Sequence, residues 1–236
     1  MSPTPPERAT RTGTSRTGGE RKNIRGEATR QRILTAAERL FAENGISVVP
    51  LRDIGVAAGQ RNHAAVQYHF GERDEVVKAI MEFRGAQSEA SRVDLVAGLM
   101  LGVTPPTVVD VVAAFVRPLA IHIEPDNYYL AFLSLYITEE GGYEGLGNVH
   151  TGASVITLRT VVSRLIPDIP AAVLEERWWV TLTSAVHALA RYHAAQRKRA
   201  SLPAPINVLI DDLVAVLSAG LTAPLVQGDP RTDGTV

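Results

Sequence analysis

Residues 51–70, LRDIGVAAGQRNHAAVQYHF, form the stretch of sequence that decides the fold. Its first eight residues place apolar side chains on one face of a short helix, which Gly59 ends. After a turn, a second short helix is predicted from about His63 to Phe70, and Gly71 stops it. Two short helices joined by a glycine-bearing turn make a helix-turn-helix, and in such a unit the second helix presents its polar face to the major groove of DNA.

A longer helix is predicted on each side of this unit. Before it, residues 27–44 repeat apolar side chains at helical spacing, and Gly45 stands where a left-handed C-terminal cap belongs. After it, a helix is predicted to begin at Glu72, because Glu72, Asp74 and Glu75 suit the positive end of a helix dipole. We expect this helix to connect the helix-turn-helix to the rest of the chain.

The chain beyond residue 100 is predicted to be helical throughout. Five further helices fit between segments rich in proline or glycine. These segments are residues 104–106, 124–126, 141–147, 167–170 and 202–205. The sequence therefore predicts an all-α protein with a helix-turn-helix domain at residues 24–71 and a helical effector-binding and dimerisation domain at residues 72–226.

The two ends of the chain lack apolar periodicity. Residues 1–23 are rich in Pro, Thr, Gly and Arg, so we expect them to be disordered, and we expect residues 227–236 to form a flexible tail. The N-terminal segment is either a solvated tail or a basic arm that adds salt-sensitive affinity for DNA phosphates. The cations of such an arm are Arg8, Arg11, Arg16, Arg21, Lys22 and Arg25.

Composition excludes several classes of protein. The chain has 236 residues, of which 45% are hydrophobic, enough to bury a core. It has no cysteine, which excludes disulfides and thiolate metal sites and fits a reducing compartment, so we expect a cytoplasmic protein with no membrane span or signal peptide. Residues 1–80 carry 13 Lys and Arg against 9 Asp and Glu, although the whole chain has a net charge of -1. The two halves therefore face different partners.

Three segments in fixed order carry a resemblance to a known family. They are RGEATRQRILTAAERLFAENG at 25–45, LRDIGVAAG at 51–59 and AAVQYHFGERDEVVKAI at 64–80. Together they resemble the DNA-binding domain of TetR-family transcriptional regulators, although the turn at residues 60–63 is one residue longer than in the commoner family pattern. The resemblance implies a homodimeric, all-helical repressor whose last two helices form a four-helix dimer interface and whose middle helices enclose a small-molecule pocket.

Two kinds of DNA contact are expected around the helix-turn-helix. Arg suits guanine and Asn or Gln suits adenine in the major groove, so the candidates for base edges are Arg61, Asn62, His63 and Gln67. The phenol of Tyr68 and the imidazole of His69 are expected to donate to phosphates, with simple packing as the alternative for His69. The N-terminus of a helix also favours the binding of a phosphate. The candidates near predicted helix starts are Thr29, Arg30, Arg52 and Arg73, and the alternative for each is a solvated surface residue with no role in DNA binding.

A ligand pocket is expected among the aromatic residues of the middle helices. Aromatic side chains with a few polar tips suit a small apolar or aromatic effector, and ordinary core packing is the alternative for each residue. The candidates are Phe115, Leu119, His122, Tyr128, Tyr129, Phe132, Tyr136, Trp179 and His187. A bound ligand is expected to change the separation of two recognition helices in a dimer, with the helix that starts at Glu72 as the lever.

The last two predicted helices are apolar on much of their circumference. They lie at about residues 171–199 and 205–222, and a subunit interface would explain both. We therefore expect a homodimer formed through these two helices.

No enzyme motif is present in the sequence. Gly-rich phosphate loops, an HExxH run and a GxSxG elbow are missing, so no catalytic residue and no cofactor is expected. No metal site is expected either, because His187 and His193 lie on different faces of one helix while His122 and His150 lie in separate segments.

The sequence thus predicts a sequence-specific DNA-binding regulator, a repressor that a small molecule releases from a palindromic operator of double-stranded DNA. The alternatives are a DNA-binding dimer with no small-molecule effector, and a helical carrier or enzyme that does not bind DNA.

Overall fold

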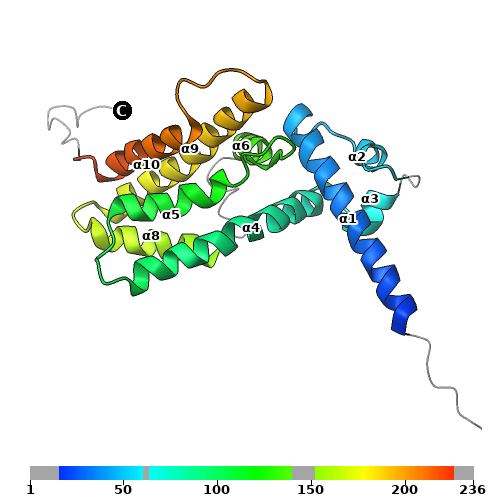
Figure 1. The fold of residues 1–236 in the computed structure, drawn as a ribbon, viewed down its shortest axis with the longest axis horizontal. Helices are drawn as coiled ribbons and strands as arrows, with labels where there is room; N and C mark the ends of the chain where they lie inside the picture. Colours follow the sequence, from blue (N-terminus) through cyan, green and yellow to red (C-terminus); the bar gives the residue numbers. More distant parts are fainter. Residues whose placement is uncertain (1–15, 61–63, 140–151, 226–236) are drawn as a thin grey trace, which may run out of the picture.

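The structure is a computed structural model that describes residues 16–60, 64–139 and 152–225. Within these ranges the chain forms helices and no strand, which confirms the predicted all-α class. Figure 1 shows two parts, a unit of three helices at one end and a bundle at the other. The three-helix unit consists of α1 (Arg16–Asn44), α2 (Leu51–Ala57) and α3 (Ala65–Phe70). α4 (Arg73–Leu101) runs from this unit into the bundle, as predicted for a connecting helix.

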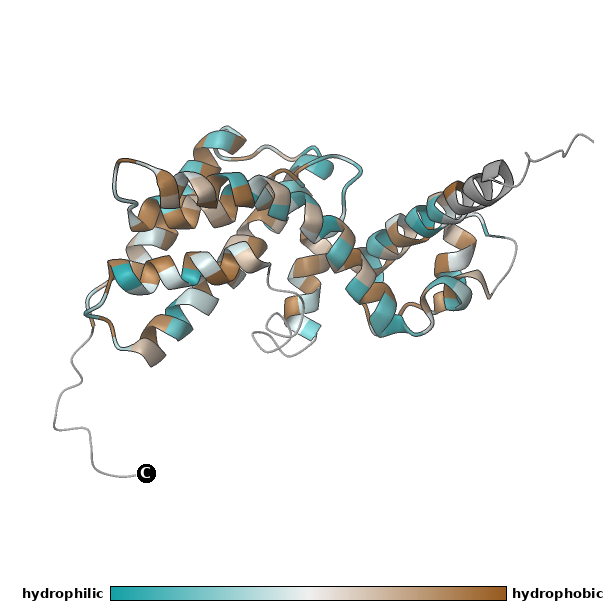
Figure 2. Ribbon diagram, turned by 90° about the horizontal axis from the view of Figure 1, so that it is seen from below, coloured by the Kyte–Doolittle hydropathy of each residue, from teal (hydrophilic) through white to brown (hydrophobic). Residues whose placement is uncertain are grey.

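The first helix is longer than the sequence predicted. Apolar spacing predicted a start near Glu27, whereas α1 begins at Arg16 and includes part of the segment that we expected to be disordered. Apolar periodicity marks only the packed part of a helix, and charged residues of good helix propensity, such as Glu20, Arg21 and Lys22, can continue it. The remainder of the predicted arm lies outside the described residues. Figure 2 shows polar and apolar residues alternating along α1, as expected of a helix with one packed face.

The bundle contains the five further helices that the sequence predicted. They are α5 (Val108–Ala120), α6 (Tyr129–Glu139), α8 (Ala153–Leu165), α9 (Ala171–Arg197) and α10 (Ile206–Thr222). Four of the five predicted breaks separate consecutive helices, and residues 141–147 lie outside the described ranges. The ends of α9 and α10 agree with the prediction to within two residues.

The packing of these helices places the two parts in contact. α10 packs on α5 and α9, α6 packs on α9, and α4 packs on α5 and α8. α1 contacts α6 as well as α2 and α4. At this junction the rings of Phe41 on α1 and Phe132 on α6 stack with their centroids 6.2 Å apart, and both side chains are completely buried. One apolar core therefore runs from the three-helix unit into the bundle.

Candidate functional site

A pair of backbone hydrogen bonds ends α2 on the side that leads to α3. Gly59 has a φ of +68°, a left-handed conformation that favours glycine. The N–H of Gln60 donates to the carbonyl of Gly55, and the N–H of Gly59 donates to that of Val56, both at 2.9 Å. This pair of bonds is the Schellman pattern that ends a helix. The sequence predicted the end of α2 at this glycine, and the structure confirms it.

The inner faces of the three helices form an apolar core. Ile33 and Phe41 of α1, Ile54 of α2 and Val66 of α3 are all completely buried. Ile80 of α4 joins them, so the start of α4 belongs to this unit by its packing. This core holds α3 in a fixed position relative to α1 and α2, because closely packed side chains resist displacement.

The outer face of α3 presents polar groups to solvent. Gln67 is exposed, and the Tyr68 side chain is 84% exposed. His69 is half-buried, and its ring lies edge-on to that of Tyr68 with the centroids 5.3 Å apart. An exposed phenol beside an imidazole at the end of α3 provides two hydrogen-bond donors for DNA phosphates. Arg61, Asn62 and His63 lie outside the described residues.

The other predicted phosphate contacts have partners within the protein. Arg73 donates to the carbonyl of Ile46, so it ties the start of α4 to the loop between α1 and α2. Arg52 pairs with the neighbouring Asp53 at 3.3 Å, and Thr29 accepts a hydrogen bond from Arg32. Arg52 and Arg73 lie in the first turns of α2 and α4, as predicted, whereas the prediction of a helix start at Thr29 and Arg30 was wrong, because α1 begins at Arg16. Of these side chains, Arg52 remains highly exposed and available to a phosphate.

One further candidate, Arg30, has a structural contact. Arg30 stacks over the ring of Phe70, with its guanidinium carbon 4.9 Å from the ring centroid. This contact ties α1 to the end of α3.

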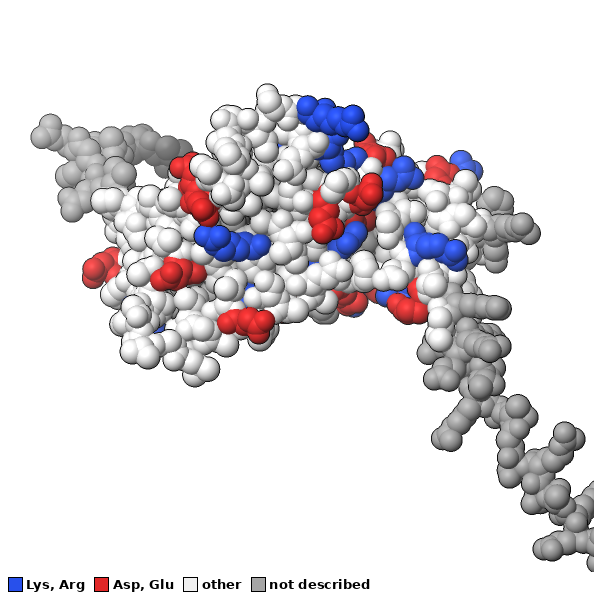
Figure 3. Space-filling view, in the orientation of Figure 1, with Lys and Arg blue, Asp and Glu red and all other residues white. Residues whose placement is uncertain are grey.

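On the face seen in Figure 3, basic and acidic side chains are interspersed rather than separated into large patches of one sign.

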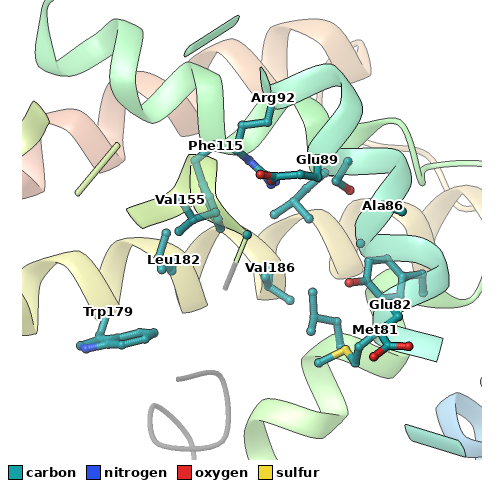
Figure 4. Close-up of a pocket in the computed structure, with 16 residues that line it drawn as sticks. Met81, Glu82, Ala86, Glu89, Arg92, Phe115, Val155, Trp179, Leu182 and Val186 are labelled. Carbon is teal, nitrogen blue, oxygen red and sulfur yellow. The ribbon is translucent and has the colours of Figure 1, made fainter. Parts of the chain in front are cut away.

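A cavity of about 320 Å³ lies in the bundle beside α4. Its walls come from α4, α5, α6, α8 and α9, and they are mostly apolar. The predicted residues that line it are Phe115, Leu119, Tyr129 and Trp179. Figure 4 shows Leu182 and Val186 of α9 facing Met81 and Ala86 of α4 across this space.

Five predicted pocket residues do not line this cavity. The rings of Phe132 and Tyr136 stack on each other inside the core between α6 and its neighbours. His187 is exposed, and its Nδ1 lies 2.7 Å from the hydroxyl of Ser134. Tyr128 instead has the guanidinium of Arg197 3.7 Å above its ring centroid. His122 is buried behind the cavity wall. The sequence pattern identified these residues by their aromatic side chains. The direction in which each side chain points depends on how the helices pack, which the pattern does not show.

The sequence analysis missed an ion pair in the cavity wall. Nη1 of Arg92 lies 2.8 Å from Oε2 of Glu89, and both residues come from α4. Oε1 of Glu89 accepts the backbone N–H of Ser154 at 3.0 Å, which fixes Glu89 against the first turn of α8. Burial raises the pKa of Glu89, but the hydrogen bonds from Ser154 and Arg92 outweigh this effect and lower it. Glu89 is therefore ionised at neutral pH.

A chain of hydrogen bonds runs from the cavity wall to the start of α6. Ser88 lines the cavity, and its hydroxyl lies 2.9 Å from Nε2 of His122, whose side chain is 1% exposed. On the other side of the ring, the Asn127 amide nitrogen lies 3.2 Å from Nδ1. The Asn127 oxygen accepts the N–H of Tyr129, which fixes the amide orientation. The Asn127 amide therefore donates to Nδ1, and Nε2–H donates to Ser88.

The ring of His122 is neutral at physiological pH. Burial lowers the pKa of His122 to about 4, and the positive charges of Arg84 and Arg92 act in the same direction. A neutral ring can accept on one nitrogen and donate from the other, as this chain of hydrogen bonds requires.

A buried ion pair joins the helix-turn-helix unit to the bundle. Glu38 of α1 is 2% exposed and accepts two hydrogen bonds from the guanidinium of Arg84 on α4, at 2.6 and 3.0 Å. Oε1 of Glu38 also accepts the N–H of Tyr128 at 2.9 Å. At the other end of α6, Oε2 of Glu139 accepts the N–H of Ile46 at 3.1 Å. Both ends of α6 are thus bonded to the helix-turn-helix unit.

Within the described ranges no group of three His, Cys, Asp or Glu residues is close enough to hold a metal ion. No helix in those ranges is both long and apolar enough to cross a bilayer.

The exposed polar second helix, set on a helical bundle that holds a cavity, makes this unit a helix-turn-helix of the kind that binds DNA. Residues 33–80 match the model of a family described as bacterial regulatory proteins, tetR family. This match supports the resemblance to TetR-family regulators that the sequence predicted for this region.

Known relatives match the chain in the same region. The HTH-type transcriptional regulators Mb3439c of Mycobacterium bovis and MT3513 of Mycobacterium tuberculosis, and the HTH-type transcriptional repressor Rv3405c of Mycobacterium tuberculosis, are each 42% identical to it over 55 residues. The match covers 23% of this chain and 29% of each relative. All three are named as transcriptional regulators and none as an enzyme, in agreement with the prediction from sequence.

Two solved structures are similar to the chain over a longer range. RolR in complex with resorcinol is 18% identical with a TM-score of 0.44, and the alignment covers 87% of this chain and 98% of RolR. A TetR-family regulator from Streptomyces coelicolor is 18% identical with a TM-score of 0.40, covering 83% of this chain and 96% of the other.

Proposed function

We propose that this protein is a transcriptional repressor that binds a palindromic operator as a homodimer and is released from it by a small molecule. The observation that carries the proposal is the position of α4. Its first turns pack in the core of the helix-turn-helix unit, and its later turns line the cavity. A molecule in the cavity therefore contacts the helix on which the recognition unit is mounted. Because such a repressor acts on DNA, we propose the cytoplasm as its location.

DNA recognition is assigned to α3 and the turn before it. The exposed face of α3 supplies Gln67 for a base edge and Tyr68 and His69 for phosphates. Arg61, Asn62 and His63 complete the candidate base contacts by their sequence position. Arg52 adds an exposed cation, whereas Arg73 and Thr29 support the unit through their internal bonds.

Dimerisation is assigned to the outer faces of α9 and α10, the helices of the predicted interface at residues 171–199 and 205–222. Val180, Val208 and Val216 are about half exposed on these helices in the single chain, at 46%, 48% and 60%. Burying apolar side chains against a second copy removes this surface from water. A two-fold dimer would present two α3 helices to two half-sites of a palindrome, about one turn of DNA apart.

The effector is assigned to the cavity beside α4. Ser88 in its wall begins the hydrogen-bond chain through His122 and Asn127 to α6. Glu38 then connects the start of α6 and Arg84 to α1. A ligand that displaces α4 shifts these contacts together, and so biases the dimer toward a spacing of recognition helices that does not fit the operator.

The DNA-binding part of the proposal is tested by selecting duplexes from a random-sequence pool with the full-length protein. Their affinity is then measured by fluorescence anisotropy at two salt concentrations. We expect a palindromic consensus, and we expect Arg61→Ala and Tyr68→Ala to weaken binding about tenfold or more. Arg159→Ala on α8 removes the same charge at a distant exposed position and should leave the affinity unchanged. Weak, unselective binding that neither variant alters would contradict the assignment of α3.

The alternative function is that of a DNA-binding dimer with no small-molecule effector. One observation favours it, because Arg92 already has Glu89 as an ion partner inside the cavity. The two functions are separated by adding a solvent extract of the host cells to the DNA complex. We expect release from the wild-type protein but not from Gly85→Phe, because Gly85 lines the cavity and a Cβ there meets no atom within 4 Å. Gly98→Phe, at an equally uncrowded position on α4 away from the cavity, is the matched control. An extract that releases no DNA from any of the three proteins favours the effector-free regulator.

A further inference from the structure

Arg92 lies deep in the cavity wall with one donor unused. The residue is 5% exposed, its Nη1 is bonded to Glu89, and its guanidinium carbon lies 5.5 Å from the ring centroid of Phe115. Its Nε is buried and has no hydrogen-bond partner in the described part of the protein. A buried N–H that makes no hydrogen bond costs about 1–3 kcal/mol, so this donor favours any molecule that brings an acceptor to it.

The guanidinium of Arg92 is held in position by Glu89, which is itself bonded to α8. Glu89 is bonded to both Arg92 and the backbone of Ser154, and Figure 4 shows the Glu89 and Arg92 side chains pointing toward each other at one end of the cavity. Gly152 leaves room for this carboxylate, because a Cβ at that position would lie 2.4 Å from Oε2 of Glu89. The donor is therefore held in place before a ligand arrives, which lowers the entropy cost of binding.

The charge of Arg92 is already balanced inside the protein. Glu89 is ionised and lies 2.8 Å from the guanidinium. A ligand carboxylate at Nε would put a second anion beside Glu89 in a poorly hydrated site, where like charges repel and desolvation is expensive. A neutral acceptor meets neither cost.

The remainder of the cavity selects for apolar groups. Its wall is formed largely by Leu119, Leu133, Val155, Leu182 and Val186 together with the ring of Phe115. Burial of an apolar molecule among these side chains is favourable in proportion to the area removed from water. The polar end and the apolar walls thus specify different parts of one ligand.

We propose that the cavity binds a small, uncharged, largely apolar molecule bearing an acceptor oxygen such as a carbonyl, and that the Nε–H of Arg92 donates to this oxygen. This inference rests on the proposed function, since it defines the chemistry of the effector site. Arg92 acts as a specificity-determining residue for the acceptor, while the apolar wall contributes most of the affinity.

Three probes of nearly equal shape test the inference: acetophenone carries a neutral carbonyl, ethylbenzene has no acceptor, and benzoate is an anion. Dissociation constants for the full-length protein are measured by ligand-detected NMR titration at pH 7.4. We expect acetophenone to bind at least about tenfold more tightly than ethylbenzene, since a hydrogen bond to a charged donor contributes about 1.5–3 kcal/mol. Benzoate is expected to bind more weakly than acetophenone. Gly85→Phe should remove acetophenone binding and Gly98→Phe should not, which locates the site.

Two variants isolate the role of Nε. Arg92→Lys keeps a cation for Glu89 but has no N–H at the Nε position, and the double variant Glu89→Gln with Arg92→Met removes both charges so that neither is left unpaired. For both variants, the dissociation constants of acetophenone and ethylbenzene are expected to agree within about twofold.

Other results would overturn the inference. Equal binding of acetophenone and ethylbenzene by the wild-type protein would show that no acceptor is selected, and tighter binding of benzoate would show that the site takes anions. Binding of none of the probes would exclude the ligand class. The proposed function is tested separately, by DNA selection in the absence of these probes. Failure of this inference can therefore be distinguished from failure of the proposed function.

Discussion

The helix-turn-helix unit and the bundle bury different kinds of side chain. Between residues 16 and 71 the buried side chains that the structure describes are apolar except for Glu38, which faces α4 and α6 at the junction. The bundle buries Arg92, His122, Asn127 and His193 as well as several hydroxyl groups. Apolar packing has one close fit and resists deformation, whereas hydrogen-bonded contacts can be exchanged for contacts to a ligand. This difference suits the proposed function, in which a rigid helix-turn-helix unit binds DNA and the contacts of the bundle change when a ligand binds.

The largest effect is expected where the apolar core of the unit meets the bundle. Phe41→Ala removes a completely buried ring that stacks on Phe132, and we expect a loss of about 3–5 kcal/mol in the free energy of unfolding. Urea denaturation followed by circular dichroism measures it. Val56→Ala, at an exposed position on α2, should change stability by less than about 0.5 kcal/mol. Similar small losses for both variants would show that the core is not closely packed.

A slightly smaller effect is expected at the one polar group that the unit buries. Glu38→Gln leaves Arg84 without its counter-charge at a site where both side chains are mostly buried, and we expect a loss of about 3 kcal/mol. The double variant Glu38→Gln with Arg84→Met should recover part of this loss, because no unpaired charge remains. Urea denaturation of the three proteins gives both values. If the single and double variants lose equal stability, the charge pair is not what joins the unit to the bundle.

The sequence predicted the helices better than the direction of their side chains. The apolar spacing of α10 and the glycines after α1, α2 and α3 are local signals, and the structure confirms the ends that they predicted. Phe115 and Trp179, two of the residues expected in a ligand pocket, line the cavity beside α4, and their contact with a ligand stays a prediction. The start of α1 was missed because no packed face marks it.

Polar contacts between distant segments could not be predicted. Glu89 and Arg92 are three residues apart on a helix, a spacing that is equally typical of a solvated surface pair. Their burial depends on the first turn of α8, more than 60 residues later in the chain. His122 was predicted to line the pocket as a polar tip, whereas its bonds to Ser88 and Asn127 place it behind the wall. Such partners are determined by the fold and not by local pattern.

The buried polar groups of the bundle predict a dependence of stability on pH. The pKa of His122 is about 4 in the folded protein and about 6.5 in the unfolded chain, so the unfolded state binds more protons between these values. The contribution of a neutral His122 is present above about pH 6.5 and is lost as the pH falls toward 4, with a total of about 3 kcal/mol. Burial also lowers the pKa of His193, which adds a loss of the same sign.

Urea denaturation at intervals between pH 4.5 and 7.5 tests this dependence. His122→Gln should be less stable than the wild type at pH 7.5, but its stability should fall less steeply toward pH 4.5, because the lowered pKa of His122 no longer contributes. A variant with the same slope as the wild type would show that His122 is not the group that titrates.

The smallest effect is expected at the surface of the rigid unit, where a contact with DNA is lost and no packing is disturbed. Tyr68→Phe removes only the hydroxyl of a side chain that is 84% exposed, so the free energy of unfolding should be unchanged. Loss of one phosphate contact from each subunit should weaken DNA binding about fivefold to tenfold, since an exposed hydrogen bond contributes a net value near the lower end of about 0.5–1.5 kcal/mol. Anisotropy titrations onto the selected operator and onto unrelated duplex measure this loss. Because phosphates carry no sequence information, both affinities should fall by the same factor. A selective loss on the operator would instead place Tyr68 at a base edge and would move the recognition face of α3 by part of a turn.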